Sequence, residues 1–235
     1  MCGIFSILSK KSKLDINDIL SSYETGKKRG PESSKINMIN DNIIFGFHRL
    51  AINGISDITS MQPFKIKQCV LICNGEIYNW KQLYKSMNIV PNTGSDCEVI
   101  IHCYKKYGMT HTLQLLDGVF AFILYDKETK NIFIARDTYG IRPLFISNDD
   151  DKYLIASEMK SIINIPYRTN NIQQFTPGNC IKINLEKNIE QHFSFSHCNS
   201  FTNYNITNEK DALFAIKHSL INAVKKRVDN TDREI

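Results

Sequence analysis

The sequence contains no long hydrophobic run. Its longest uninterrupted apolar stretch, residues 119–125, is far shorter than the ~20 apolar residues that a membrane-spanning helix needs. The apolar stretch at residues 4–8 is also short, and no basic region precedes it, so it does not have the form of a secretory signal. We therefore expect a cytoplasmic protein with no membrane partner.

The sequence also has no tract of basic residues. Its formal net charge is only +5, and the Lys and Arg residues are spread along the chain. Nucleic-acid-binding domains usually gather their positive charge on one face or in one segment. We therefore expect no nucleic-acid partner.

No CxxC pair occurs among the seven cysteines. Cys69 with Cys73, and Cys97 with His102 and Cys103, lack the paired spacing of structural zinc sites. These residues are more typical of small buried side chains, and an odd number of cysteines without a compact framework favours reduced thiols. We expect no metal site and no cofactor in this chain.

The apolar patterns predict an α+β protein with one sizeable core, since 42% of the 235 residues are hydrophobic and 23% are charged. Antiparallel hairpins dominate, and the helices fall in separate blocks. The predicted strands are residues 2–8, 36–39, 42–52, 68–73, 119–126, 131–136, 144–147, 153–156, 181–185 and 190–195. The predicted helices begin near residues 14, 79, 95 and 208.

Three local signals refine this prediction. Asn79 with Gln82 and Ser95 with Glu98 have the spacing of capping boxes, and the second box puts Asp96 in the first turn of a helix that ends near residue 107. Asn74-Gly75 is a turn signal that favours positive φ, so strand 68–73 is predicted to stop there.

Cys2 is the candidate nucleophile. Removal of Met1 would leave a thiol and an α-amino group on one residue, with ordinary pKa values near ~8.5 and ~8. The amine could then take the thiol proton without a histidine, as in N-terminal nucleophiles. The plain alternative is that residue 2 merely begins an edge strand.

Other residues supply what a thiolate needs to cleave an amide. Asn74 and Gly75 offer a side-chain amide and a backbone N–H as oxyanion donors. Arg49 offers a planar fork for a carboxylate, and Asp96 offers an anion for an ammonium group. A substrate with a carboxylate, an amine and a side-chain amide is glutamine or asparagine. Taken singly, these residues are also typical of a turn, a surface cation and a helix start.

Several ordered motifs resemble the class II glutamine amidotransferase domain, an N-terminal-nucleophile hydrolase. They are Cys2-Gly3-Ile4-Phe5, Arg29-Gly30-Pro31, Phe47-His48-Arg49-Leu50-Ala51-Ile52, Asn74-Gly75-Glu76-Ile77-Tyr78-Asn79, Gly94-Ser95-Asp96-Cys97-Glu98, Leu116-Asp117-Gly118-Val119-Phe120-Ala121-Phe122, Ala135-Arg136-Asp137 and Ser157-Glu158-Met159-Lys160. The resemblance implies a four-layer αββα sandwich with Cys2 at a strand start between the sheets. It also implies a glutamine site in which Arg49 binds the carboxylate, Asp96 the amine, and Asn74 with Gly75 the oxyanion. Leu50, Ile52 and Glu76 would complete that site.

Within the class, the motifs are most similar to asparagine synthetases, in which ammonia from glutamine amidates ATP-activated aspartate. Gly140-Ile141-Arg142-Pro143-Leu144 is closer to the phosphoribosylamine branch, and Glu32 replaces the usual Asp. A non-catalytic or standalone module on the same fold is the other alternative.

The resemblance predicts a glutaminase domain at residues 2–195, a linker at 196–207 and the start of a synthetase domain at 208–235, which ends before the Ser-Gly-Gly-Leu-Asp-Ser loop. The expected partner is an ammonia-accepting synthetase domain, which would carry the ATP and Mg sites, either because the chain is a fragment or because it is naturally truncated. A homodimer also stays open.

Overall fold

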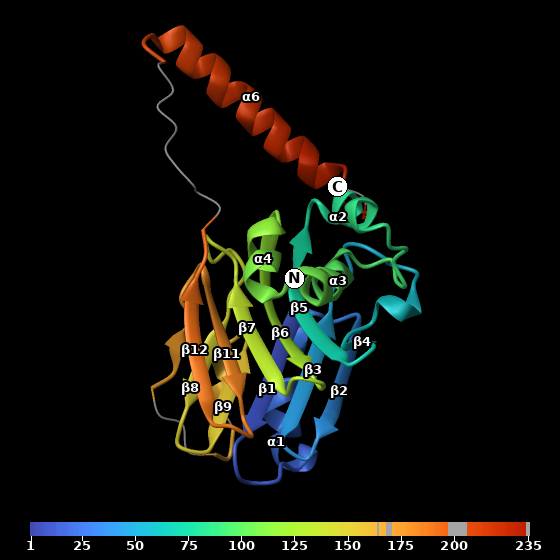
Figure 1. Cartoon of the computed structure of the whole chain (residues 1–235), viewed down its shortest axis with the longest axis vertical. Helices are drawn as coiled ribbons and strands as arrows, with labels where there is room; N and C mark the ends of the chain where they lie inside the picture. Colours follow the sequence, from blue (N-terminus) through green and yellow to red (C-terminus); the bar gives the residue numbers. More distant parts are fainter. Residues whose placement is uncertain (164, 168–170, 197–205, 234–235) are drawn as a thin grey trace.

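Two antiparallel six-stranded sheets form the centre of the described part of the chain, residues 1–163, 165–167, 171–196 and 206–233. This computed structural model is drawn in Figure 1. The first sheet runs in the order β10 (Gln173–Gln174), β8 (Phe145–Asn148), β9 (Lys152–Ala156), β1 (Gly3–Ser9), β3 (Ile43–Arg49) and β2 (Ser33–Asn40). The second runs in the order β12 (Ile189–Ser194), β11 (Asn179–Asn184), β7 (Asn131–Arg136), β6 (Gly118–Asp126), β5 (Cys69–Ile77) and β4 (Phe64–Ile66).

Helices cover the outer face of each sheet. The first sheet packs against α1 (Ile16–Glu24) and α5 (Lys160–Ile163), and the second against α2 (Trp80–Met87), α3 (Val99–Tyr107) and α4 (Met109–Leu115). Short 3₁₀ turns occur at Lys27–Arg29, Ile58–Ser60 and Asp96–Glu98. None of the helices in the described residues is long and apolar enough to cross a membrane.

The alternation of side chains in the strands explains these layers. In β1, Ile4 and Leu8 face the second sheet, whereas Phe5 and Ile7 face α1. In β5, Val70 belongs to the layer between the sheets, and its neighbours face the helices. Because successive side chains point to opposite faces, strands buried on both sides produce three apolar layers. The four-layer αββα architecture is thereby confirmed.

The last helix, α6 (Glu209–Val228), begins where the sequence predicts. The Asn208 side chain accepts a hydrogen bond from Asp211 N at 2.9 Å. α6 lies apart from the sandwich along most of its length and meets it at its C-terminal end, beside α2 (Figure 1). Most of the predicted linker 196–207 lies outside the described residues.

Asn74-Gly75 does not form a turn, so this prediction is wrong. β5 continues through both residues to Ile77, and they pair with Ala121 and Phe120 of β6. Neither residue has positive φ. Nine residues of β5 pair with β6, and this pairing outweighs the local preference of Asn-Gly for a turn.

Two capping predictions also need correction. Asn79 makes no cap bond, because its side chain instead joins Leu115 O and Asp117 N at 2.8 and 3.1 Å. Ser95 does cap its helix, but Glu98 is fully buried and accepts from Asn92 rather than from the cap residue. The predicted strand 42–52 ends at residue 49, and β4, β10, α4 and α5 were not predicted.

Candidate active site

Cys2 lies immediately before β1, on the side of that strand that faces the second sheet. Its side chain is partly buried against the layer between the sheets. The thiol donates to Leu50 O at 3.3 Å and accepts from Leu50 N at 3.4 Å, and Arg29 Nε donates to the Cys2 carbonyl at 2.9 Å. Burial raises the pKa of the Cys2 thiol, and the Leu50 N–H opposes that rise. The thiol is therefore held in place but needs a base to become a nucleophile.

The edge of β5 that faces away from β6 provides backbone donors next to Cys2. Phe120, which pairs with Gly75, uses its own N–H and carbonyl on Asp137, at 3.2 and 2.8 Å. Gly75 and Phe120 are therefore a non-hydrogen-bonded pair, and the Gly75 N–H points away from β6. The neighbouring positions Cys73 and Ile77 present their N–H groups to the same edge, as the alternation of a strand requires.

Side chains from other segments occupy this edge on either side of Gly75. Gln62 bonds both Cys73 N and Cys73 O, at 2.6 and 3.1 Å. The Asp96 carboxylate accepts from Ile77 N at 2.6 Å. Gly75 lies between these two anchors and lines a cavity, so its N–H is available to a ligand there.

Asn74 provides a second donor. Its side chain has the orientation of Val70 and Ile72, toward the space between the sheets where Cys2 lies. The residue is 1% exposed, and its Nδ2 has no hydrogen-bond partner among the described residues. A buried unpaired donor costs ~1–3 kcal/mol, so this group is poised for an acceptor that enters the cavity.

Arg49 and Asp96 lie around the same cavity. The Arg49 guanidinium donates to Gly54 O at 2.6 Å, which uses one of its five N–H groups. Asp96 is buried and accepts from Ile77 N and from the Asn53 side chain, the latter at 3.1 Å. Burial raises the pKa of the Asp96 carboxyl, against the effect of these two donors. An ammonium group beside it would favour the charged form.

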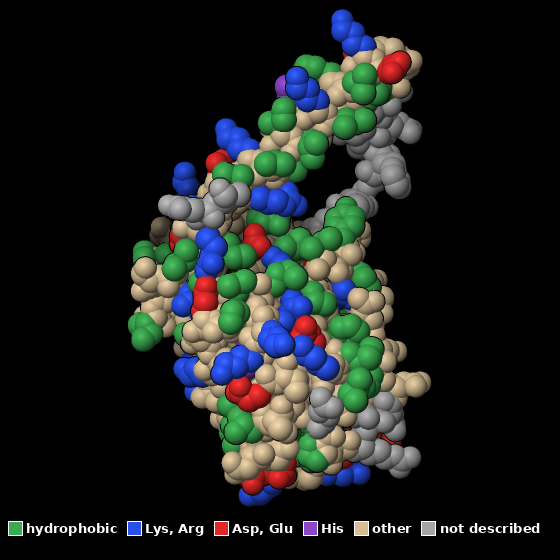
Figure 2. Space-filling view, turned by 180° about the vertical axis from the view of Figure 1, so that it is seen from behind, with side chains coloured by type: hydrophobic (Ala, Val, Ile, Leu, Met, Phe, Trp, Pro, Cys, Tyr) green, Lys and Arg blue, Asp and Glu red, His purple; other side chains and the backbone are tan. Residues whose placement is uncertain are grey.

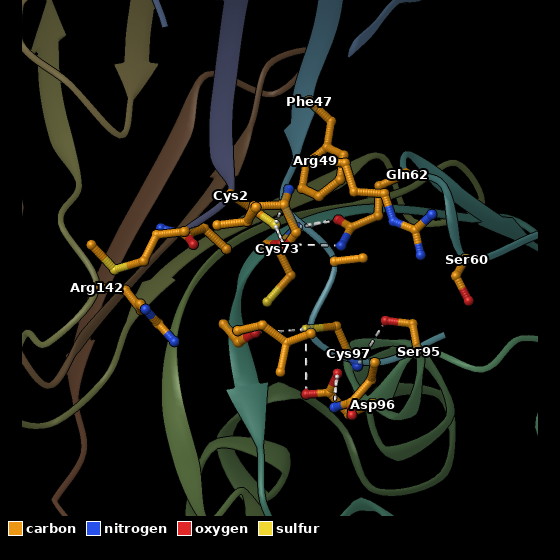
Figure 3. Close-up of a pocket in the computed structure, with 17 residues that line it drawn as sticks. Cys2, Phe47, Arg49, Ser60, Gln62, Cys73, Ser95, Asp96, Cys97 and Arg142 are labelled. Atoms are coloured by element: carbon orange, nitrogen blue, oxygen red, sulfur yellow. Dashed lines mark hydrogen bonds between the residues drawn. The ribbon is translucent and has the colours of Figure 1, made fainter. Parts of the chain in front are cut away.

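The cavity brings together seven of the eight residues predicted for the site. Figure 3 shows Cys2 and Arg49 across the gap from Ser95, Asp96 and Cys97. The seven predicted residues that line the cavity are Cys2, Arg49, Leu50, Ile52, Asn74, Gly75 and Asp96. Glu76 does not line it: it pairs with Arg142 and borders a neighbouring cavity next to α6.

Some lining residues were not predicted for the site. Asn53, Gln62 and Ser95 reach it through contacts with Asp96, Cys73 and Cys97. Arg142 also lines the cavity. Only its place in a family motif could have pointed to it, because it lies far along the chain from Cys2.

The arrangement can bind an amino acid by both of its charged ends and place a third group against the Cys2 thiol. The paired donors of Asn74 and Gly75 suit an oxygen that becomes negative during attack. Within the described residues, no group of three or more His, Cys, Asp or Glu side chains could hold a metal ion.

Comparisons with known proteins identify the family of the chain. The glutamine amidotransferase domain family matches residues 1–212. The glutamine-hydrolyzing asparagine synthetase of Gallus gallus is 39% identical over 195 residues, covering 79% of this chain and 34% of that protein. The Pongo abelii protein of the same name is 34% identical over 258 residues, covering 100% of this chain and 45% of that protein. The chain thus spans less than half the length of these curated relatives.

A solved structure shares the fold. The glutamine phosphoribosylpyrophosphate amidotransferase from B. subtilis, complexed with ADP and GMP, superimposes with a TM-score of 0.69. The match covers 83% of this chain and 49% of that one at 22% identity. At this identity, the likeness supports the sandwich architecture and says nothing further about the substrate.

Proposed function

The chain belongs to the glutamine amidotransferase domain family, and we propose that it hydrolyses the side-chain amide of glutamine to glutamate and ammonia. One observation carries the proposal. The unpartnered Asn74 Nδ2 and the outward Gly75 N–H line the same cavity as the Cys2 thiol. Two donors beside a nucleophile are what acyl transfer through an oxyanion requires.

The reaction begins when Met1 has been removed. While Met1 is attached, the Cys2 nitrogen is a peptide nitrogen and cannot act as a base. Once freed, the α-amine accepts the thiol proton, and the thiolate attacks the amide carbon of glutamine. The oxyanion is stabilised by Asn74 and Gly75 and then collapses to a thioester. The amide nitrogen leaves as ammonia after taking the proton from the α-ammonium group.

Water completes the cycle. The free α-amine takes a proton from a water molecule, whose oxygen attacks the thioester and creates the oxyanion again. The collapse of this second intermediate releases glutamate, and the Cys2 sulfur recovers a proton. The same two donors therefore act in both halves of the reaction.

Binding of the substrate is assigned to the charged groups around the cavity. Arg49 binds the α-carboxylate in a bidentate manner, and Asp96 binds the α-ammonium group. Glu76, which the resemblance places on the amine side, pairs with Arg142 outside the cavity, so we assign it no direct contact with the substrate. Leu50 and Ile52 line the site beside them. The proposal is supported by the position of Arg49 and Asp96 on one cavity and by the raised pKa of Asp96, which a bound cation would offset.

We further propose that the ammonia passes to a synthetase domain that forms asparagine. This is supported by the similarity to asparagine synthetases more than twice as long. ATP and Mg would bind in that domain and not in this chain. The six free cysteines of the described residues fit a reducing cytosolic compartment.

The surface of α6 also supports a partner domain. Hydrophobic side chains follow its length (Figure 2). Those more than 50% exposed are Leu213, Phe214, Ile216, Leu220 and Val224. A row of exposed apolar side chains is typical of an interaction site, so we propose that the synthetase domain packs against this helix. If the isolated chain instead dimerises through α6, that face serves the homodimer that the resemblance leaves open.

Of two alternatives, only the second makes a different prediction for glutamine hydrolysis by this chain. A phosphoribosylamine-branch enzyme shares the glutaminase step and differs in the domain that receives ammonia, and a non-catalytic module would bind glutamine without turnover. The test is glutamate production by the chain after Met1 removal, with Cys2→Ala and Cys180→Ala as a matched pair. Cys180 is buried in β11, away from the cavity. We expect turnover in the wild type and in Cys180→Ala but none in Cys2→Ala; no turnover in the processed wild type would refute the proposal.

A further inference from the structure

The loop at residues 50–54, here called the binding loop, has no regular secondary structure of its own. It follows β3 directly and supplies the backbone groups that hold the Cys2 thiol. Backbone N–H and carbonyl groups that are withdrawn from water need partners. In an irregular loop those partners must come from elsewhere in the chain. The segments that supply them therefore hold the loop in its conformation.

Residues 230–233, here called the C-terminal strap, provide several of these partners. Arg233 Nε donates to Ala51 O at 2.9 Å. Asp232 N and Thr231 Oγ1 both donate to Ile52 O, at 3.1 and 3.4 Å. The strap comes after α6, in the segment that the sequence assigns to a following domain, yet it bonds the backbone of the binding loop at Ala51, Ile52 and Gly54.

Glu32 also contacts both the binding loop and the C-terminal strap. Its carboxylate accepts from Ala51 N at 2.7 Å and forms an ion pair with Arg233. The Ala51 backbone is thus held both at its N–H and at its carbonyl. The Glu32 side chain is long enough to reach both partners.

Asp232 is linked to Arg49, the proposed ligand of the substrate carboxylate, through hydrogen bonds to Gly54. Its side chain accepts from Gly54 N at 2.8 Å, and Gly54 O accepts from the Arg49 guanidinium at 2.6 Å. Gly54 has φ of +63°, and a Cβ there would lie 2.4 Å from Ser60 Oγ. The loop therefore turns sharply at a residue that only glycine fits, and Asp232 fixes its N–H.

The strap is itself anchored to the sandwich. The buried Asn230 accepts from Trp80 Nε1 at 2.7 Å and donates to Ile77 O at 3.4 Å. Lys226 pairs with Asp117 at 2.6 Å just before it. These contacts fix the strap to α2 and to the end of β5. The strap can therefore hold the binding loop in a fixed position.

We propose that the C-terminal strap positions the glutamine-binding loop, with Asp232 as a positioning residue for Arg49 through Gly54. The inference rests on the proposed glutaminase function and adds a residue from beyond the predicted glutaminase domain to its substrate site. Because Arg49 contacts the unreacting carboxylate equally in the ground and transition states, misplacing it weakens binding rather than chemistry. Loss of Asp232 therefore raises KM for glutamine and leaves kcat close to its wild-type value.

The experiment compares Asp232→Ala, Asp232→Asn and the control Asp229→Ala in the full chain after Met1 removal. Asp229 is an exposed carboxylate three residues earlier that does not reach the loop. We expect Asp232→Ala to raise KM by about three- to tenfold, the effect of losing one hydrogen bond. Asp232→Asn keeps an oxygen acceptor and should restore most of the affinity, and Asp229→Ala should behave as the wild type.

Hydrogen–deuterium exchange of residues 50–54 gives a readout that does not depend on turnover. We expect faster exchange in Asp232→Ala by a similar factor and no change in Asp229→Ala. Lower kcat with an unchanged KM would indicate a merely structural role and overturn the inference, as would unchanged exchange in the binding loop. If the wild type fails to hydrolyse glutamine, the proposed function is refuted, and the exchange measurement still decides whether the strap holds the loop.

Discussion

Replacing Asn74 should separate catalysis from stability. In the structure, Asn74 Nδ2 is buried without a partner, so the folded protein carries a cost of ~1–3 kcal/mol for that donor. Asn74→Ala removes the donor and this cost together. We therefore expect the free energy of unfolding to stay close to the wild-type value or to increase.

The effect on the reaction should be large. Losing one oxyanion donor typically lowers kcat by ~10²–10³, which corresponds to ~3–4 kcal/mol of transition-state stabilisation. Bound glutamine has no oxyanion, so KM should change little. Asn74→Asp should lower kcat at least as much, because its carboxylate would face the developing negative charge.

Asn79 is the matched control, five residues further along the same motif. Its side chain is fully engaged in structural bonds to Leu115 O and Asp117 N. Asn79→Ala should therefore lose ~1–3 kcal/mol of stability and keep kcat. The assay is steady-state glutamate production with urea denaturation of the same preparations. If Asn74→Ala keeps its kcat within about threefold of the wild type, where ~10²–10³ is expected, the oxyanion role is wrong.

Arg49→Lys should raise KM for glutamine with little change in kcat, because a point charge replaces a bidentate fork; a collapse of kcat at unchanged KM would exclude Arg49 as the carboxylate ligand. Gly75→Ala should destabilise the protein by ~1–3 kcal/mol in urea denaturation, because its Cβ would lie 2.8 Å from Phe120 Cβ and from Val119 O; an unchanged midpoint would contradict the close pairing with β6. The value of kcat/KM should rise with pH through neutrality, since burial raises the pKa of the Cys2 thiol and its base must be neutral; a flat profile would argue against thiol activation as the limiting step.

Much of the fold was predictable because its strands are buried on both faces. Continuous apolar runs such as β6 predicted central strands, and the motifs supplied the order of the layers. Asn74-Gly75 shows the limit of local reasoning. Its composition favours a turn, but pairing with β6 holds both residues in extended conformation. The same extended backbone aims the Asn74 side chain and the Gly75 N–H at the cavity.

The contacts that complete the site could not be predicted. Asn53 meets Asp96 across 43 positions of sequence, and Asp232 meets Gly54 across 178. No local pattern encodes such pairs, since they exist only once the sheets have brought distant segments together. Arg142 and Glu76 are a similar case, joined across 66 positions.

In the proposed mechanism, Cys2 that has been freed of Met1 forms the acyl-enzyme with glutamine. Peptide mass mapping of an acid-quenched turnover mixture detects this intermediate. We predict a glutamyl thioester on the N-terminal peptide that begins with Cys2, and none on any peptide that retains Met1. Turnover by a preparation that fully retains Met1, or a modified cysteine elsewhere with Cys2 unmodified, would show that Cys2 is not the nucleophile.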